Sequence, residues 1–430
     1  MSETTGGTRR DFMKTTSTAA LGAAVVGFAK ATGAQPNGDT LKVGLIGCGG
    51  RGTGAVREAL LADPNTRLVA MGDTFMDQVD DALKRLNTEG SGVQDRMAVD
   101  EVQKFDGFDN YKGVIAACDV IVLATPPAFR PAHLRACIEA GKHVFCEKPI
   151  AVDPVGVRHV METCEMAKQK GLTIVSGLCY RYENSKRDII KRIQDGEVGD
   201  ILAMETWYNT GGLWLKRRRK DWTDMEFQVR NWLYYDWLSG DHNNEQHIHS
   251  LDKIAWAMGD VYPVKATASG GRSQRTDPDY GNIYDHFNTC YEWETGLRCF
   301  SSCRQWEGSS TYVNDHIIGT KGVATLQEHT IKFHDGTTWQ HEKAADDNMY
   351  QNEHNEFFAC IRNNTPKVDD YMCKSTMMAI MARISAYTGT TVTWDEMMAS
   401  DLNLQPATLA WGENPINPVA VPGDRAEKKG

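Results

Sequence analysis

The first half of the chain alternates short, nearly continuous apolar runs with longer segments of mixed polarity. The runs predict buried parallel strands, and the mixed segments between them predict helices. The predicted strands cover residues 41–47, 67–73, 119–127, 142–151 and 172–177, and the predicted helices cover 54–64, 129–141 and 154–171. This order predicts an α/β fold, a doubly wound parallel sheet of the Rossmann type, over residues 40–178.

The second half has a different pattern, in which most of the recognisable elements are strands. Glycine-containing turns separate several of these strands, which favours an open, mainly antiparallel sheet. The predicted strands cover 201–209, 264–270, 283–294, 297–306, 314–326 and 329–336. Residues 373–389 predict a helix with methionines on its apolar face, a packing role that suits methionine. We expect a C-terminal α+β domain for substrate binding and oligomerisation over 179–402, and an irregular tail over 403–430.

Length and charge agree with this division. A chain of 430 residues is too long for one ordinary core, so two domains are expected. The formal net charge of −10 argues against a general nucleic-acid binder. The basic run at residues 216–220 is interpreted as a solvated loop.

The N-terminus resembles a twin-arginine export signal. Arg9 and Arg10 precede a weakly apolar run of small residues, 15–29, and then a polar stretch. The apolar run is too short to span a membrane, and cleavage is expected near Ala31 or Ala34, so residues 1–34 form the signal. The resemblance implies a periplasmic protein that the twin-arginine machinery exports folded, with its cofactor tightly bound and no membrane insertion after cleavage. The alternative is an uncleaved disordered tail.

The eleven cysteines are scattered and give little sign of a zinc site. Five of them, Cys48, Cys118, Cys137, Cys146 and Cys164, fall in apolar patterns that predict small buried side chains. Cys299 and Cys303 would share one face of a strand, but no second cluster accompanies them. A single disulfide in an exported protein stays open as an alternative.

A glycine-rich turn follows the first predicted strand. Gly47, Gly49 and Gly52 fill a G-x-G-x-x-G pattern between that strand and a helix. The first glycine permits the turn, the second admits a pyrophosphate, and the third lets helix and strand pack closely. Asp73 ends the next strand 21 positions after Gly52, where a carboxylate binds the adenosine ribose hydroxyls. Because a carboxylate repels a 2′-phosphate, NAD is favoured over NADP.

Two later turns complete a resemblance. Thr125 and Pro126 follow one strand, and Glu147, Lys148 and Pro149 follow the next. With the glycine turn, these motifs resemble the Gfo/Idh/MocA family of NAD(P)-dependent oxidoreductases of sugars and cyclitols, over roughly residues 41–402. The resemblance implies that Lys148 lies near the nicotinamide and the substrate, and that Thr125, Pro126 and Glu147 border the cofactor. It also implies a homo-oligomer. The family often has a histidine after the Thr-Pro turn, where this chain has Arg130.

The second functional segment is SGDHNNEQHIHSLD, residues 239–252. It resembles the family pattern D-x-G-x-H-x-x-D, with Glu245 in place of the first Asp, His249 as the histidine and Asp252 as the last Asp. Residues four apart share a helix face, so we expect Glu245 to orient His249 and to raise its basicity. His242 and His247 are expected to bond polar groups at the domain junction. A metal site is the less favoured alternative, because H-x4-H-x-H is not a zincin spacing.

The predicted chemistry is hydride transfer between a sugar or cyclitol hydroxyl and NAD. Lys148, Glu245 and His249 are the candidate catalytic residues, with His249 as base and Lys148 on the substrate oxygen. Two alternatives stay open: a glycoside-cleaving enzyme that oxidises, eliminates and re-reduces with recycled NAD, and a non-catalytic sugar-binding module. The candidate pocket residues are Tyr180, Arg181, Trp207, Trp232 and Asp252.

Overall fold

Six parallel strands form the first sheet, in the order β3-β2-β1-β4-β5-β6. The computed structural model describes residues 39–342 and 347–423. The order reverses between β1 and β4, and ligands of open parallel sheets bind at such a reversal, beyond the carboxyl ends of the strands. The strands are β1 (Leu41–Ile46), β2 (Thr66–Gly72), β3 (Gln103–Phe105), β4 (Val120–Leu123), β5 (His143–Cys146) and β6 (Ile174–Ser176).

Helices cover both faces of this sheet. Side chains of α2, α3 and α12 pack with Val43 and Leu45 of β1 on one face, whereas α4, α5 and α6 pack with Ile46 on the other. This burial on both faces explains why the strands are almost continuously apolar. The helices of this domain are α2 (Gly50–Ala62), α3 (Met76–Leu86), α4 (Asn110–Ala117), α5 (Arg130–Glu139) and α6 (Pro154–Lys170), with short 3-10 turns η1 (Gln94–Arg96), η2 (Val99–Glu101) and η3 (Pro127–Phe129).

The predicted Rossmann fold is confirmed, including all five predicted strands and all three predicted helices. The sequence pattern did not reveal β3 or the helices α3 and α4. Strand β3 is a three-residue edge strand whose residues are exposed or half-buried, so it lacks the apolar run that marks the other strands.

Nine strands form the second sheet, in the order β14-β13-β12-β11-β7-β10-β9-β8-β15. Neighbouring strands are antiparallel except β10 and β7, which are parallel, so the expectation of a mainly antiparallel sheet is confirmed. The strands are β7 (Ile201–Thr210), β8 (Lys265–Gly271), β9 (His286–Glu292), β10 (Arg298–Gln305), β11 (Tyr312–Gly319), β12 (Gly322–Thr325), β13 (Thr330–Phe333), β14 (Thr338–Gln340) and β15 (Val392–Thr393).

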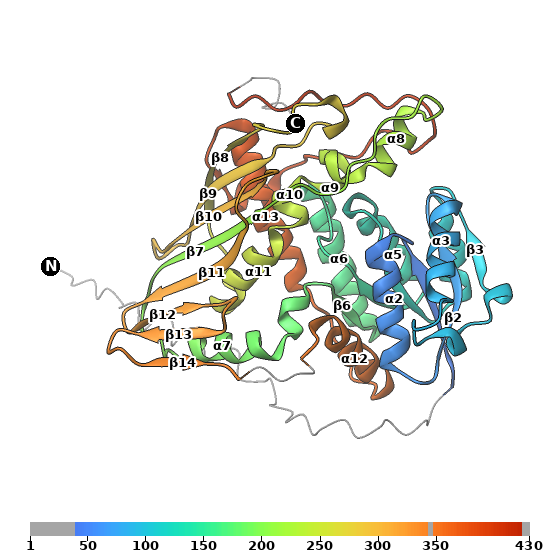
Figure 1. The fold of residues 1–430 in the computed structure, drawn as a ribbon, viewed down its shortest axis with the longest axis horizontal. Helices are drawn as coiled ribbons and strands as arrows, with labels where there is room; N and C mark the ends of the chain where they lie inside the picture. The colour runs from blue at the N-terminus through green and yellow to red at the C-terminus, as the bar shows by residue number, and fades with distance from the viewer. Residues whose placement is uncertain (1–38, 343–346, 424–430) are drawn as a thin grey trace.

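Helices α11 and α13 lie between the two sheets (Figure 1). Their buried side chains join those of α6 and of the second sheet in one core, which also contains residues of β1, β4 and β5. The two domains therefore share a core. The remaining elements are α7 (Asn184–Gln194), α8 (Asp224–Arg230), α9 (Asp236–Ser239), α10 (His242–Glu245), α11 (Ile248–Ala257), α12 (Met349–Arg362), α13 (Tyr371–Thr388) and α14 (Trp394–Ala399), with η4 (Cys179–Tyr182), η5 (Trp232–Tyr234) and η6 (Pro278–Tyr280).

Helix α12 returns to the first domain although it is encoded far along the chain. Its last residue, Arg362, forms an ion pair with Asp63 at the end of α2. After the helix, Val368 pairs with Ile174 of β6 as an isolated parallel bridge. Residues 349–369 thus complete one face and one edge of the parallel sheet.

The C-terminal segment has the irregular backbone that the sequence predicted, with no helix or strand over residues 400–423. The predicted export signal, residues 1–34, and the end of the tail, 424–430, lie outside the described residues. Over the described part of the chain, no helix combines the length and the apolar character that a membrane crossing requires. All eleven cysteines are described and free, and the five that were expected to be buried are buried.

Candidate active site

The three glycines of the first turn meet three different geometric demands. Gly47 has a φ of +94°, a backbone conformation that other residues rarely adopt. A Cβ on Gly52 would lie 1.9 Å from the Gly47 carbonyl oxygen, so only glycine lets α2 pack this closely. A Cβ on Gly49 would meet nothing within 4 Å, which leaves open space at the N-terminus of α2. This geometry fits a dinucleotide pyrophosphate at the helix N-terminus.

Asp73 lies beside this turn at the end of β2. Its carboxylate accepts hydrogen bonds from the backbone N–H of Cys48, at 2.7 Å, and of Phe75, at 3.1 Å. Burial raises the pKa of Asp73, while the two N–H donors oppose the rise. The contacts hold the carboxylate against the glycine turn, as a ribose-binding role requires.

Thr125 lies at the end of β4, across the strand-order reversal from Asp73. Its side chain is buried, and its Oγ1 has no hydrogen-bond partner among the described residues. A buried hydroxyl without a partner is uncommon and costs stability. A dinucleotide lying along the carboxyl ends of the strands would supply a partner. Pro126 follows, half-buried, as the residue immediately before η3.

Arg51, inside the glycine turn, binds three carboxylates. Its guanidinium donates to Glu147, to Glu58 at 3.0 Å and to Glu353 of α12 at 2.6 Å. Burial would raise the pKa of Glu147, but Arg51, Lys148 and Arg130 together lower it. Glu353 is also buried, and its pKa is raised well above the usual range in spite of Arg51. Arg51 occupies a variable position of the G-x-G-x-x-G pattern, so the sequence did not identify it as a functional residue.

Glu58, Glu353 and His354 have side-chain atoms close enough together to hold a metal ion. The guanidinium of Arg51 already donates to both carboxylates of this group. A cation there would lie against an arginine that already pairs with both carboxylates. We therefore interpret the group as an ion-pair cluster that anchors α12 to α2.

The loop after β5 places Lys148 at the junction of the two domains. The Lys148 Nζ donates to the main-chain carbonyl of Glu245 and lies 3.0 Å from its carboxylate oxygen Oε1. The Lys148–Pro149 peptide bond is cis. Arg130, at the position where the resemblance leads one to expect histidine, is buried and donates to the Pro149 carbonyl. Arg130 therefore supports the loop that presents Lys148.

His249 lies near this pair but is not bonded to Glu245. The helix is interrupted at Gln246 and His247, so Glu245 ends α10 and His249 lies in the first turn of α11. The expectation of one shared helix face with a direct carboxylate–imidazole contact is therefore wrong. Among the described side chains, Glu245 pairs with Lys148, and the His249 Nδ1 is buried without a partner.

The charge state of His249 also differs from the expectation. Burial, followed by the positive charges of Lys148, Lys253 and Arg51, lowers its pKa well below the usual value. His249 is thus kept neutral, with a basicity that is lowered and not raised. Its ring meets the edge of Tyr180, with centroids 5.4 Å apart.

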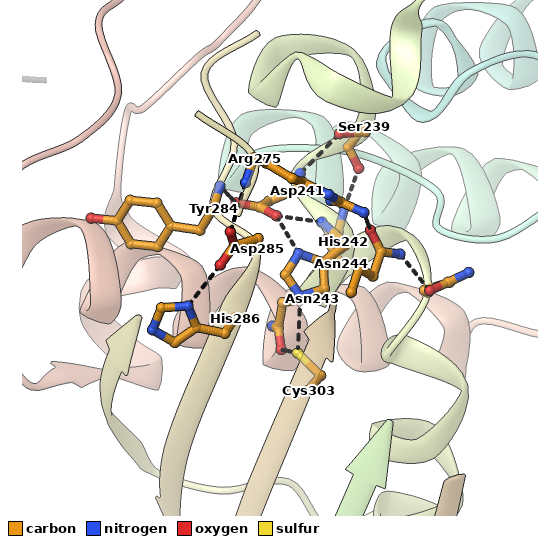
Figure 2. A network of polar contacts seen from close by, with 12 residues as sticks. Ser239, Asp241, His242, Asn243, Asn244, Arg275, Tyr284, Asp285, His286 and Cys303 are labelled. Carbon is orange, nitrogen blue, oxygen red and sulfur yellow. Dashed lines mark hydrogen bonds and ion pairs between the residues drawn. The ribbon is translucent and has the colours of Figure 1, made fainter. Parts of the chain in front are cut away.

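Asp241 anchors the segment that carries Glu245 (Figure 2). One carboxylate oxygen accepts from the backbone N–H and the ring of His242, and the other accepts from the Tyr284 N–H at 2.8 Å and the Tyr387 hydroxyl at 2.6 Å. Asn244 donates to the Ala151 carbonyl at 3.0 Å and so joins α10 to the loop after Lys148.

The other two histidines of the segment bond polar neighbours, as predicted, but not at the domain junction where these bonds were expected. The His242 Nε2 lies 3.5 Å from the Cys303 sulfur, and the His247 Nε2 lies 2.7 Å from the Ser301 hydroxyl. Both partners are on β10, so these bonds dock the segment onto the second sheet and do not join the two domains.

Of the candidate pocket residues, Tyr180 and Trp232 are partly exposed, whereas Arg181, Asp252 and Trp207 have other roles. Tyr180 faces His249, and the Lys253 ammonium lies 4.4 Å from the centroid of its ring. Trp232 is half-buried beside Trp214. Lys253 is itself buried and paired with Asp315 of β11, a contact that its sequence neighbourhood did not signal.

Arg181 and Asp252 are engaged with each other. The Arg181 guanidinium donates to both oxygens of Asp252, which also accepts from the Ser375 hydroxyl at 2.7 Å. These contacts join η4, α11 and α13, so the pair packs helices and does not present free groups to a substrate. Trp207 lies on the opposite face of the second sheet, against Tyr312, and is also not a pocket wall.

The parallel sheet, the glycine turn and the ribose-side carboxylate define a dinucleotide-binding protein with a polar site where its two domains meet. Residues 41–178 match the model of the oxidoreductase family with an NAD-binding Rossmann fold, Gfo/Idh/MocA. Over these residues the chain is an NAD-binding protein similar to the oxidoreductases of this family.

Curated relatives match part of the chain, and a solved structure shares its fold. The chain is 28% identical over 206 residues to 2,7-anhydro-N-acetylneuraminate hydratase of Escherichia coli, covering 47% of this chain and 50% of that protein. It is 26% identical over 298 residues to inositol 2-dehydrogenase of Burkholderia vietnamiensis, covering 67% and 74%. The structure of scyllo-inositol dehydrogenase from Lactobacillus casei with NAD(H) and scyllo-inositol superposes with a TM-score of 0.61 and 20% identity, covering 84% of this chain and 100% of the other.

Proposed function

We propose that this protein transfers a hydride between a hydroxyl-bearing carbon of a sugar or cyclitol and a tightly bound NAD. The contact between Lys148 of the NAD domain and Glu245 of the second domain, beside a neutral His249, carries the proposal. The inositol dehydrogenases among the relatives support a polyhydroxylated ring as the substrate class.

NAD, when bound, supplies the hydride acceptor. As the C–H electron pair leaves the carbon, the hydroxyl gives its proton to a protein base and the carbon–oxygen double bond forms. The Lys148 ammonium is positioned to donate to the same oxygen and to stabilise its negative charge. The product is a ketone, and the reverse direction uses the same groups.

We assign the proton to His249 and Glu245 jointly. A neutral imidazole has a free nitrogen ready to accept a proton, but the surrounding cations disfavour its charged form. The proton therefore has to move on, and the Glu245 carboxylate on Lys148 is the nearby acceptor in this arrangement. Glu245 stands where the family pattern has aspartate. Its longer side chain is the one that contacts Lys148.

For substrate contacts we retain Tyr180 and Trp232, which are partly exposed. Tyrosine and tryptophan present apolar faces to sugar rings while keeping a polar edge. Arg181 and Asp252 move to a supporting role, because their polar groups already bond each other.

A second candidate function is oxidation, elimination and re-reduction with recycled NAD. The Escherichia coli relative is named as a hydratase, whose name describes no net oxidation. A site that oxidises a ring carbon transiently would need the same Lys148 and base. A non-catalytic sugar-binding module is disfavoured, since that function would not require the Lys148–Glu245 contact across the domain junction.

Purified protein incubated with inositols and with glycosides, with and without added NAD, distinguishes these functions. Net NADH formation supports the dehydrogenase, and turnover without net NADH supports recycling. Lys148→Met and His249→Asn should each lower kcat by about 100-fold or more, the usual range for general acid–base groups. His316→Asn on β11 is the matched control and should keep wild-type turnover. Near-normal turnover by either site variant, with NAD still bound, would show that the site is wrong.

We further propose that the protein is exported folded through the twin-arginine pathway. The Arg9–Arg10 pair and the small-residue apolar run after it support this proposal. Replacing both arginines by lysine should retain the protein in the cytoplasmic fraction of a bacterial host. Unchanged export of that variant would contradict the proposal.

A further inference from the structure

Three phenylalanines cluster at the carboxyl edge of the parallel sheet. Phe75 follows Asp73 by two residues and donates its N–H to the Asp73 carboxylate. Phe108 lies three residues beyond β3, and its ring centroid is 6.3 Å from that of Phe129 in η3. This edge is where a dinucleotide bound by the glycine turn has to lie, and Asp73 marks its adenosine end.

The C-terminal segment adds a fourth ring to this cluster. The Trp411 centroid lies 4.7 Å from that of Phe108 and 5.6 Å from that of Phe75. The segment is fixed to the NAD domain on its way there, since the Leu404 N–H donates to Asp153 at 2.8 Å and the Gln405 side chain donates to the Ala128 carbonyl at 3.0 Å.

Helix α8 of the second domain reaches the same place. The Arg230 guanidinium lies 3.7 Å from the centroid of the Phe75 ring and forms ion pairs with Asp77 of α3 and Glu226, both at 3.0 Å. Because two carboxylates balance this arginine, it offers no free positive charge for a 2′-phosphate.

Helix α8 and the C-terminal segment are also bonded to each other. The Met225 N–H donates to the Gly412 carbonyl at 3.1 Å. The Gln228 side chain donates to the Asn414 carbonyl at 2.6 Å and accepts from the Asn414 side chain at 2.8 Å. In Figure 1 the C-terminal segment follows the upper edge of the molecule to α8. The two elements thus form one unit across the end of the NAD domain.

We propose that α8 and residues 404–414 form a clasp over the adenosine end of the dinucleotide site and make NAD a resident cofactor. Release of NAD then requires three sets of contacts with the NAD domain to open together. They are the hydrogen bonds of Leu404 and Gln405, the Arg230–Asp77 ion pair and the Trp411 ring contacts. The inference rests on NAD binding and is independent of the substrate and of the net reaction.

The test measures NAD retention in the absence of substrate. Protein loaded with NADH is mixed with excess NAD, and the decay of bound NADH fluorescence gives the dissociation rate. Trp411→Ala and Arg230→Met should each raise this rate about tenfold, which corresponds to the loss of about 1.4 kcal/mol. Trp411→Phe should retain most of the slow release, because it keeps a ring against Phe108.

Leu409→Ala, an exposed apolar position two residues from Trp411, is the matched control and should release NADH at the wild-type rate. Far-UV circular dichroism and the Tm of each variant verify folding. An unchanged rate in folded Trp411→Ala and Arg230→Met would overturn the clasp. Tighter NADH binding by Trp411→Ala would also overturn it, because the indole would then be occupying the cofactor's place.

Discussion

Gly49 and Gly52 are three residues apart and require glycine for different reasons. A side chain at Gly52 would strike the Gly47 carbonyl, which is a demand of the fold. A side chain at Gly49 would enter open space, so the demand there comes from the ligand. Substitution can therefore separate folding from cofactor binding within a single turn.

Gly49→Ala should fold with wild-type Tm but bind NAD about tenfold more weakly or worse, since the methyl group enters the pyrophosphate site. Gly52→Ala should lower the free energy of unfolding by about 1–3 kcal/mol, the usual cost of overpacking. Urea denaturation and NADH titration of both variants measure the two effects. Equal stability losses in the two variants would contradict the assignment.

At the residue scale, functional residues that belong to a local motif were predictable from the sequence. Residues whose partners lie far along the chain were not. The glycine turn, Asp73 and Lys148 follow strands in recognisable motifs, and the structure brings them to one edge of the sheet. Arg51 and Glu353 meet only because α12 folds back over three hundred positions later. No local pattern contains that information.

At the element scale, the segment from Asp241 to Asp252 contains a residue with a strained backbone, Asp241, directly before helix α10. Asp241 has φ 72° and ψ 163°, a region that is essentially reserved for glycine. Its four hydrogen bonds, to His242 (two), Tyr284 and Tyr387, hold this conformation. Helix α10 begins directly after Asp241, and Glu245 at its end pairs with Lys148.

Asp241→Ala should lower the free energy of unfolding by about 3–5 kcal/mol, because buried donors lose their acceptor and the strain stays. Asp241→Gly loses the same bonds but relieves the backbone, so it should be more stable than the alanine variant by about 1–3 kcal/mol. Urea denaturation of both gives the difference. A glycine variant no more stable than the alanine variant would show that the backbone is not strained.

The same segment shows the limit of helical spacing as a predictor. A separation of four residues placed Glu245 and His249 on one face, but the interruption at Gln246 and His247 separates them. His247 bonds Ser301 of β10 and Asn243 bonds the Ala379 carbonyl of α13, contacts that the spacing cannot reveal. The element types were predictable from polarity, whereas the break depends on tertiary contacts.

At the scale of the whole molecule, several histidines are buried in neutral form. Burial lowers the pKa of His133 and of His247 to about 3, and lowers those of His249 and His354 well below the usual value. In the unfolded chain these side chains take up protons near pH 6.5. The unfolded state therefore binds more protons as the pH falls below that value, and the folded state loses stability.

We expect the free energy of unfolding to fall between pH 7.5 and 5, with each buried histidine contributing up to about 1.4 kcal/mol per pH unit below 6.5. His133→Phe should make the fall of the free energy of unfolding with pH shallower by about one proton, because it removes one side chain that takes up a proton on unfolding. The phenylalanine ring keeps the stacking on Tyr111 and Phe129, so the fold should be retained. Phe129→Leu, in the same cluster, should shift stability equally at both pH values. Identical slopes for wild type and His133→Phe would refute the prediction.

The second sheet presents one face away from the NAD domain. Phe300 on β10 is 52% exposed and Tyr312 on β11 is 44% exposed, on the side opposite to α11 and α13. We expect this face to pack against a second copy of the chain. Phe300→Glu should shift the mass measured by light scattering toward the monomer, whereas Val264→Glu, exposed just before β8, should not. A monomeric wild-type protein would contradict the expectation.

The return of α12 to the first domain has a consequence for the evolution of this chain. The stretch that ends at residue 178 looks like an independent module in sequence, yet it obtains Glu353, Arg362 and Val368 from residues that follow the second sheet. A gene fusion that exchanged residues 41–178 alone would leave Arg51 without one of its carboxylates and β6 without its bridge to Val368. Recombination in such a chain has to transfer both segments together, so the two halves are constrained to diverge as one unit.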